Sequence, residues 1–458
     1  MRPIRTGLLL TAQLALLAGL SAPVAAAAAG PPAPGAYFVQ SVVTGLNAAD
    51  AGGAVDQHNP KGNEDHQQWT LRASGGASVL ESADQAGRCL GRSGDRARVV
   101  GCGDAAAAWE VLPSGASSWR LKAPGAEQYL SLAPKPAGAS YPAGLQVAGA
   151  GPLADFYLTP TAPPTAPMPG PQERTLDQLT FLTAHNAYAN GVDGGFAPPF
   201  VNLAPNQTRG IQQQLADGVR GFMLDIHQTP DGAILCHNSC TLVSRPVALW
   251  VDLQRITDFL AANRGEFVTV FLEDYVSPEV LRGEITRVRG LNDVLFRPDT
   301  AGVREHGWPR VADLVASNRR LMIFTDHSRD ADRAAGLTRD SFGVMYQREW
   351  TVENYWSMGS GLGSSDWSCY SRWYGGDDVL PLTRTEPGFR PLFVMNHFRD
   401  VTIAPTASND NGKLLDRAQR FCRPAARKKP VFLAVDRYDL GNPGAAVAAL
   451  NGWVDGAP

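Results

Sequence analysis

The chain has 458 residues, which is long for one ordinary domain, since domains average roughly 150 residues. Its 41 lysine and arginine residues nearly balance its 44 aspartate and glutamate residues, and the formal net charge is −3. This balance excludes a global field that would draw the protein onto nucleic acid, and we expect no nucleic-acid partner. Any anionic ligand must therefore be recognised locally.

Residues 1–29 are typical of a secretory signal peptide. Arg2 and Arg5 precede an apolar run at 7–20, and small residues follow at 24–27. The apolar stretch is short and leads into a segment rich in proline, alanine and glycine, which favours a signal peptide over a membrane anchor. We expect a secreted, extracellular protein in an oxidising setting.

Six cysteines allow 15 pairings, and only some of these keep every bridge local. A zinc site is the alternative, but no Cys-x-x-Cys pair accompanies a suitably spaced histidine pair. Export favours disulfides, and we expect three bridges between neighbours in the sequence: Cys89–Cys102, Cys236–Cys240 and Cys369–Cys422.

A proline-rich stretch at 161–172 divides the chain into two parts and predicts a semi-rigid spacer. Upstream, residues 36–160 alternate short strand-like pieces with Gly, Asn and Asp turns. Downstream, residues 173–458 alternate apolar strand-like runs with helical stretches. We expect two domains, the first all-β and the second α/β.

The upstream part repeats itself about every 40 residues. Aromatic residues close the three units, within the segments 66–71, 107–111 and 155–158. Together with the Arg-Cys-Leu-Gly motif at 88–91, this resembles the ricin-type β-trefoil, a family of sugar-binding modules. The resemblance implies a β-trefoil at 36–160 and a possible carbohydrate ligand, for which Asn47, Gln57 and Asn63 are the candidate contacts. The closing aromatic residues are more typical of a core than of a sugar platform.

The downstream part contains eight strand candidates, and eight parallel strands indicate a TIM-type barrel. One helix is expected at 247–264, where Leu249, Leu253, Ile256 and Leu260 recur at helical spacing. The strand candidates are 180–184, 221–224, 233–235, 267–272, 320–325, 343–346, 392–395 and 431–435.

Polar residues follow these runs closely, at the position where catalytic groups of a barrel belong. They are His185, Asn186, Asp225, His237, Glu273, Asp326, His327, Asn396, His397 and Asp436. Two histidines beside a set of oxygen donors indicate phosphoryl chemistry, since one imidazole can accept a proton from an attacking hydroxyl while the other protonates the departing oxygen. Asn186, Asp225 and Glu273 offer hard oxygen atoms that suit Ca²⁺.

Four ordered motifs, at 183–188, 218–225, 235–237 and 270–275, resemble the X domain of phosphatidylinositol-specific phospholipase C. The similarity extends to plant and microbial proteins that contain this domain. It implies that His185 acts at the attacking inositol hydroxyl and His237 at the leaving oxygen, while Asn186, Asp225 and Glu273 match calcium ligands.

Other site residues are expected from their positions. Met223 stands where eukaryotic members carry a further carboxylate, which leaves the calcium affinity open. Asp436 could orient a catalytic histidine or form a structural ion pair, and His327 and Arg220 are candidate substrate contacts. The aromatic loop at 350–374 could touch a lipid surface, stack on a sugar ring, or simply pack as core.

The leading hypothesis is a secreted phosphodiesterase of the phosphatidylinositol phospholipase C type. It would cleave a phosphoinositide-like phosphodiester by histidine acid and base catalysis, with help from Ca²⁺ and transient contact with a membrane surface. The alternatives are a secreted lectin-like binding protein with a degenerate barrel and a glycerophosphodiester phosphodiesterase. Both histidines and three ligand positions favour an enzyme, whereas Met223 favours the binding protein.

Overall fold

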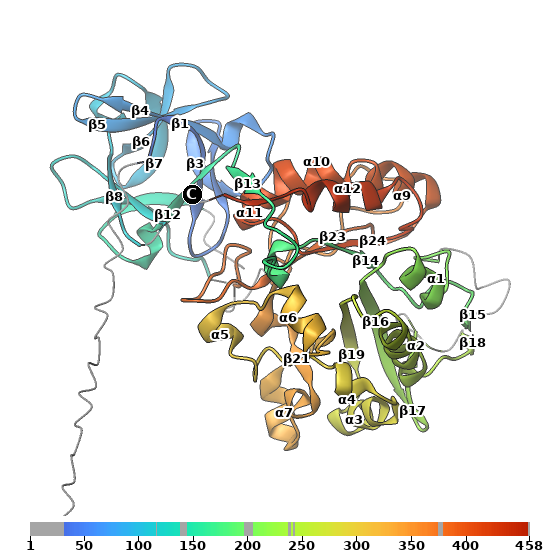
Figure 1. Cartoon of the computed structure of the whole chain (residues 1–458). Helices are drawn as coiled ribbons and strands as arrows, with labels where there is room; N and C mark the ends of the chain where they lie inside the picture. The colour runs from blue at the N-terminus through green and yellow to red at the C-terminus, as the bar shows by residue number, and fades with distance from the viewer. Residues whose placement is uncertain are drawn as a thin grey trace, which may run out of the picture.

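The computed structural model describes residues 32–115, 117–137, 144–196, 205–236, 240, 243–373 and 379–456 (Figure 1). The predicted signal peptide lies outside these residues. An all-β part lies at the amino-terminal end of the described chain, and an α/β part follows it. No described helix is long and apolar enough to cross a membrane.

The strands of residues 35–160 join in one 12-stranded antiparallel sheet, which further pairings between β1 and β4 and between β7 and β11 close on itself. Trp69 and Trp109 are fully buried in its core, and each indole N–H donates to a backbone carbonyl at 2.9 Å. These aromatic residues are therefore core residues, as predicted. The strands are β1 (Gly35–Ser41), β2 (Asn47–Ala51), β3 (Ala54–His58), β4 (Gln68–Ser74), β5 (Ala77–Ser82), β6 (Arg88–Ser93), β7 (Arg96–Gly101), β8 (Glu110–Pro113), β9 (Trp119–Lys122), β10 (Tyr129–Leu132), β11 (Leu145–Ala148) and β12 (Phe156–Pro160).

A parallel sheet forms the centre of the second part, in the order β21-β20-β19-β16-β14-β24-β23-β22. Its members are β14 (Phe181–Ala184), β16 (Gly221–Thr229), β19 (Val268–Tyr275), β20 (Leu321–Thr325), β21 (Val344–Tyr346), β22 (Thr351–Glu353), β23 (Leu392–His397) and β24 (Phe432–Val435). All eight predicted strands exist, but β17 (Gly232–Leu235) is an antiparallel partner of β16, and β22 was not predicted. A three-residue strand is too short to show a hydrophobic period.

The fold-class prediction of a β-trefoil followed by a TIM-type barrel is wrong for residues 35–160 and fits the α/β part only in part. The structure instead joins an antiparallel barrel at residues 35–160 to an open parallel half-barrel. The opening lies between β21 and β22, which are edge strands of the sheet and do not pair with each other. Only the one-turn helix α8 (Gln347–Trp350) separates them along the chain. These two strands of three residues each therefore leave the ring unclosed.

Helices cover the outer face of the parallel sheet (Figure 1). The predicted helix is α2 (Leu249–Ala262), and its stripe of Leu249, Leu253, Ile256 and Leu260 is fully buried in the core. The other α-helices are α1 (Ile211–Ala216), α3 (Pro278–Arg287), α4 (Leu291–Val294), α5 (Val303–His306), α6 (Val311–Ala316), α7 (Arg329–Ala335), α9 (Ala404–Asn411), α10 (Leu414–Arg417), α11 (Arg423–Ala426) and α12 (Pro443–Leu450).

The proline-rich stretch does not behave as the predicted spacer. Its strand β13 (Thr165–Pro167) pairs with β25 (Trp453–Asp455) near the carboxyl end of the chain. The two parts also touch directly, since the buried Gln40 side chain donates to the Ala425 carbonyl at 2.8 Å. The stretch is therefore packed onto the α/β part.

The three predicted disulfides are confirmed: Cys89–Cys102, Cys236–Cys240 and Cys369–Cys422. No cysteine is free among the described residues.

Candidate functional site

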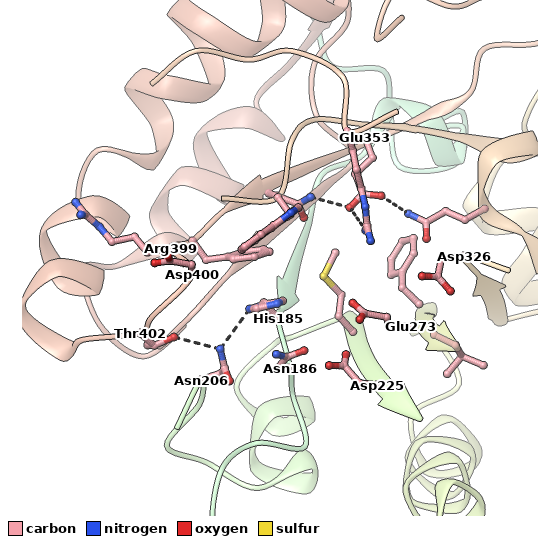
Figure 2. Close-up of a pocket in the computed structure, with 18 of the residues that line it drawn as sticks. His185, Asn186, Asn206, Asp225, Glu273, Asp326, Glu353, Arg399, Asp400 and Thr402 are labelled. Carbon is pink, nitrogen blue, oxygen red and sulfur yellow. Dashed lines mark hydrogen bonds and ion pairs between the residues drawn. The ribbon is translucent and has the colours of Figure 1, made fainter. Parts of the chain in front are cut away.

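A cavity of about 550 Å³ lies at the carboxyl ends of the parallel strands (Figure 2). Residues that lie within β16, β19 and β23 or directly follow β14 and β20 line it: His185, Asn186, Asp225, Glu273, Asp326 and Asn396. Six of the ten polar residues predicted from the sequence to follow the strands therefore line one cavity. His397, in contrast, is buried beneath the cavity wall, and burial lowers its pKa to about 3.

His185 and Asp436 form a dyad at one edge of the cavity. The His185 Nδ1 and Asp436 Oδ1 atoms are 2.8 Å apart, and they come from the ends of neighbouring strands β14 and β24. The imidazole also stacks on the Phe398 ring, with centroids 3.5 Å apart. Because Asp436 engages Nδ1, Nε2 is left to exchange a proton with a ligand.

Two further side chains, missed by the sequence interpretation, hold Asp436 in place. Asn206 donates to Asp436 Oδ1 at 3.0 Å, and the Thr402 hydroxyl donates to Oδ2. Asn206 also reaches Thr402 Oγ1 at 3.1 Å (Figure 2). Both lie in loops outside any recognisable motif, so no sequence signal marked them. This network fixes the carboxylate and hence the imidazole.

The backbone turns sharply after β14 and after β24. Asn186 and Arg437, which directly follow His185 and Asp436, have φ values of 43° and 49°. Non-glycine residues adopt this left-handed region at a cost, which is common at functional sites. The Gln207 side chain ties the two strand ends together by donating to the carbonyls of His185 and Val435, at 2.8 and 2.9 Å.

Asn186, Asp225 and Glu273 present oxygen atoms on the floor of the cavity (Figure 2). Asp225 and Glu273 are register neighbours on β16 and β19. Burial raises the pKa of Asp225 well above its ordinary value, and the negative charge of Glu273 raises it further. Two carboxylates held side by side fit a divalent cation, because the cation would offset the repulsion between their negative charges.

Met223 lies beside this trio and lines the cavity. Its side chain packs against the core cluster that contains Phe271 and Phe324. It precedes Asp225 by two residues on β16, and alternate residues of a strand share one face. A glutamate at this position has a side chain of similar length and would reach the same space.

An ion pair forms the opposite wall. Arg372 Nη1 donates to Glu353 Oε1 at 3.0 Å, and Asn396 donates to the same oxygen at 2.7 Å. Burial raises the pKa of Asp326, on the same wall, to about 6. The sequence interpretation missed Glu353 and Arg372 because Glu353 ends the unpredicted strand β22 and Arg372 lies in a loop.

His237, the predicted second histidine, lies outside the described residues. Its neighbour Cys236 is described, and the Cys236 N–H donates to the Asp225 carbonyl at 3.2 Å. The Cys236–Cys240 bridge spans the position of the histidine. Cys236 is therefore hydrogen-bonded to a residue of the site, and the role of His237 stays a prediction.

The predicted substrate contacts do not line the cavity. Arg220 precedes β16 at the amino end of the strand, where Glu266 and two carbonyls hold its guanidinium. His327 faces Asp332, with Nε2 and Oδ1 3.5 Å apart. Both predictions rested on position in the sequence, which does not fix where a side chain points.

The three candidate sugar contacts differ in how far they are exposed to solvent. Asn47 and Gln57 are buried in the antiparallel barrel, where they bond to Gln67 and Thr44 at 3.0 and 2.5 Å. Asn63 is exposed. The three therefore do not present one free polar surface.

Residues 173–357 match the family model described as PI-PLC X 1. Among curated proteins, the chain is similar to the PI-PLC X domain-containing protein At5g67130 of Arabidopsis thaliana, with 28% identity over 280 residues. That match covers 60% of this chain and 61% of the plant protein.

A second relative is an uncharacterized secreted protein of Arthroderma benhamiae, 25% identical over 279 residues, with 59% of each chain covered. The chain thus spans about three fifths of the length of these relatives. Among solved structures, one titled "Modulation of S.aureus Phosphatidylinositol-Specific Phospholipase C Membrane Binding" has a TM-score of 0.39 and 12% identity. It covers 61% of this chain and 94% of that one.

Proposed function

We propose that this protein is a secreted phosphodiesterase that cleaves a phosphoinositide-like phosphodiester. The observation that carries the proposal is the His185–Asp436 dyad beside three clustered oxygen donors in one cavity. The family match of residues 173–357 supports the same reaction class.

The dyad provides the base of the reaction. His185 Nε2 would accept the proton of a ring hydroxyl as that oxygen attacks phosphorus, while Asp436 stabilises the imidazolium through Nδ1–H. The bond from phosphorus to the leaving oxygen breaks, and His237 would protonate that oxygen. The products are a cyclic phosphate and the released alcohol.

Asn186, Asp225 and Glu273 would hold a calcium ion, because these hard oxygen donors share the floor of the cavity. When bound, such an ion neutralises charge on the phosphate. Arg372 is a cation of the cavity lining, and its pairing with Glu353 restrains the guanidinium there.

The mouth of the cavity favours a lipid substrate. Trp356 and Val401 line the cavity and are 39% and 46% exposed, and the nearby Leu362 is 77% exposed. Trp350 of the same aromatic loop is core. Exposed apolar side chains around an opening suit a membrane surface. They support a substrate that is presented at an interface.

The test is to incubate the protein with phosphatidylinositol, glycerophosphoinositol and a glycerophosphodiester, with and without calcium. Phosphorus NMR should show a cyclic phosphate, and chromatography of the extracted lipid should show diacylglycerol. A linear phosphate from the glycerophosphodiester, with no cyclic product, would contradict the proposed reaction and favour the glycerophosphodiester phosphodiesterase. His185→Ala is the inactive reference.

A further inference from the structure

A second cavity, of about 210 Å³, lies between the antiparallel barrel and the α/β part, near α11 and β13. The barrel contributes Ser117, Tyr157 and Thr159 to its lining, and the α/β part contributes Thr385, Arg390 and Lys428. At ~30 Å³ for each water molecule, the cavity has room for about seven waters or one small polar ligand.

The charge of this lining is strongly unbalanced. Four cations, Arg390, Arg423, Arg427 and Lys428, face a single carboxylate, Asp455. Asp455 is already occupied, because Arg423 Nε donates to its Oδ1 at 2.7 Å and the Lys429 N–H to its Oδ2 at 2.9 Å.

The positive charges of the remaining three cations are poorly balanced by carboxylates. Arg390 Nη2 lies 3.9 Å from Asp455 Oδ2, the limit of an ion pair. Within the described chain, neither Arg427 nor Lys428 forms an ion pair with a carboxylate. Arg427 donates to Ser117 Oγ at 3.3 Å and lies 3.9 Å over the Tyr157 ring, while Lys428 Nζ donates to two carbonyl oxygens, at 3.1 and 3.2 Å.

Burial of these groups is unfavourable without a counter-charge. Burial and the charges of Arg390 and Arg384 lower the pKa of Lys428 well below its ordinary value. Burial likewise lowers the pKa of Arg427. An anion in the cavity would reverse both effects. The hydroxyls of Ser117 and Thr385 provide neutral donors for its other oxygens.

We propose that this interdomain cavity binds a phosphate-type oxyanion, free or as a monoester, between Arg390, Arg427 and Lys428. Such an anion would bridge the two parts of the chain, since Ser117 and the cations belong to different parts. The site is separate from the catalytic cavity, with which it shares no lining residue.

Calorimetric titration of the whole protein with inorganic phosphate, at constant ionic strength and with a chelator present, tests this site. We expect saturable binding and a phosphate-dependent rise in Tm. Arg390→Gln, at an exposed position, should weaken binding about tenfold and Arg427→Gln at least as much, because each removes charge-assisted hydrogen bonds. The exposed Arg333→Gln on α7 is the matched control and should bind like the wild type.

A parallel titration with glycerol 1-phosphate distinguishes a free phosphate from an ester, because an ester that fills the rest of the cavity should bind more tightly. Absence of saturable binding would overturn the proposal. So would binding that survives Arg390→Glu but is lost in Arg372→Gln, since that result would place the anion in the catalytic cavity.

Discussion

At the scale of single residues, the site depends on one imidazole whose orientation is over-determined. Three residues contact His185. Its Nδ1 lies 2.8 Å from Asp436 Oδ1 and 3.4 Å from Asn206 Nδ2, and its ring stacks on Phe398 with the centroids 3.5 Å apart. A base held in this way needs little reorganisation before it accepts a proton. The neighbouring candidate cation site has fewer oxygen donors, because Met223 offers none.

Replacing the base should therefore affect turnover directly. His185→Ala should lower kcat on a soluble phosphodiester about 10²–10⁴-fold, the range for a general base. His306→Ala, at an exposed histidine on α5, is the matched control and should leave kcat unchanged. Steady-state assays of both variants measure this, and equal activities would contradict the assignment of His185.

Met223 tests the cation site. Met223→Glu should lower the calcium concentration for half-maximal activity, because it adds a carboxylate beside Asp225 and Glu273. Met223→Gln has a similar shape without the charge and should change this concentration less. Calcium titrations of activity give the values. A wild type indifferent to calcium and chelators, with a Met223→Glu variant that binds none, would show that the trio is not a metal site.

At the scale of elements, helix α2 shows how a buried polar group coexists with a correctly predicted apolar stripe. Asp252 is fully buried in the first turn of the helix, and its Oδ1 accepts from Arg255 at 2.5 Å. Burial raises the pKa of Asp252 to about 7, although Arg255 opposes this shift. In the folded protein the carboxyl is therefore mostly neutral below about pH 7.

This shift makes stability depend on pH in a definite direction. Because the folded pKa lies above the unfolded value of about 3.9, the contribution of Asp252 is fully present below pH ~4 and is lost as the pH rises through about 7. Asp252→Asn should consequently raise the free energy of unfolding relative to wild type more at pH 8 than at pH 5. Between pH 5 and pH 8 this effect should grow by at most about 3 kcal/mol, at ~1.4 kcal/mol per pH unit between pH 5 and the folded pKa of about 7.

Urea unfolding at the two pH values measures this difference. Asp258→Asn, an exposed residue of the same helix, should show no such change. An Asp252→Asn effect that is equal at both pH values would show that the carboxyl is ionised throughout the range.

At the scale of the whole molecule, the proline-rich stretch belongs to the α/β part. β13 pairs with β25, and Arg423 donates to the carbonyls of Pro163 and Pro164, at 3.0 and 2.5 Å. Cutting the chain after this stretch would expose the edge of β25 and leave Arg423 without these acceptors.

A fragment that begins at Thr161 should thus have a higher Tm than one that begins at Gln172. Both should keep turnover on a small soluble substrate, because every described residue that lines the catalytic cavity lies downstream of the stretch. Differential scanning calorimetry and activity assays test the two parts of this prediction. Loss of turnover in a folded Thr161 fragment would show that the barrel completes the site.

The sequence by itself determined the features that rest on local pattern: the eight strands, the stripe of α2, the three disulfides, and the strand-end polar residues that line the cavity. Each follows from periodicity or from the spacing of reactive side chains along the chain. The tertiary structure alone decided the opening between β21 and β22, the antiparallel direction of β17, the Asn206–Thr402 support of Asp436, and the Arg372–Glu353 wall. The Asn206–Thr402 and Arg372–Glu353 contacts join residues 196 and 19 positions apart, and no local pattern records which distant groups packing brings into contact. The opening and the direction of β17 involve strands that are close in the sequence, but they depend on how the whole sheet is assembled, which a short apolar run does not specify.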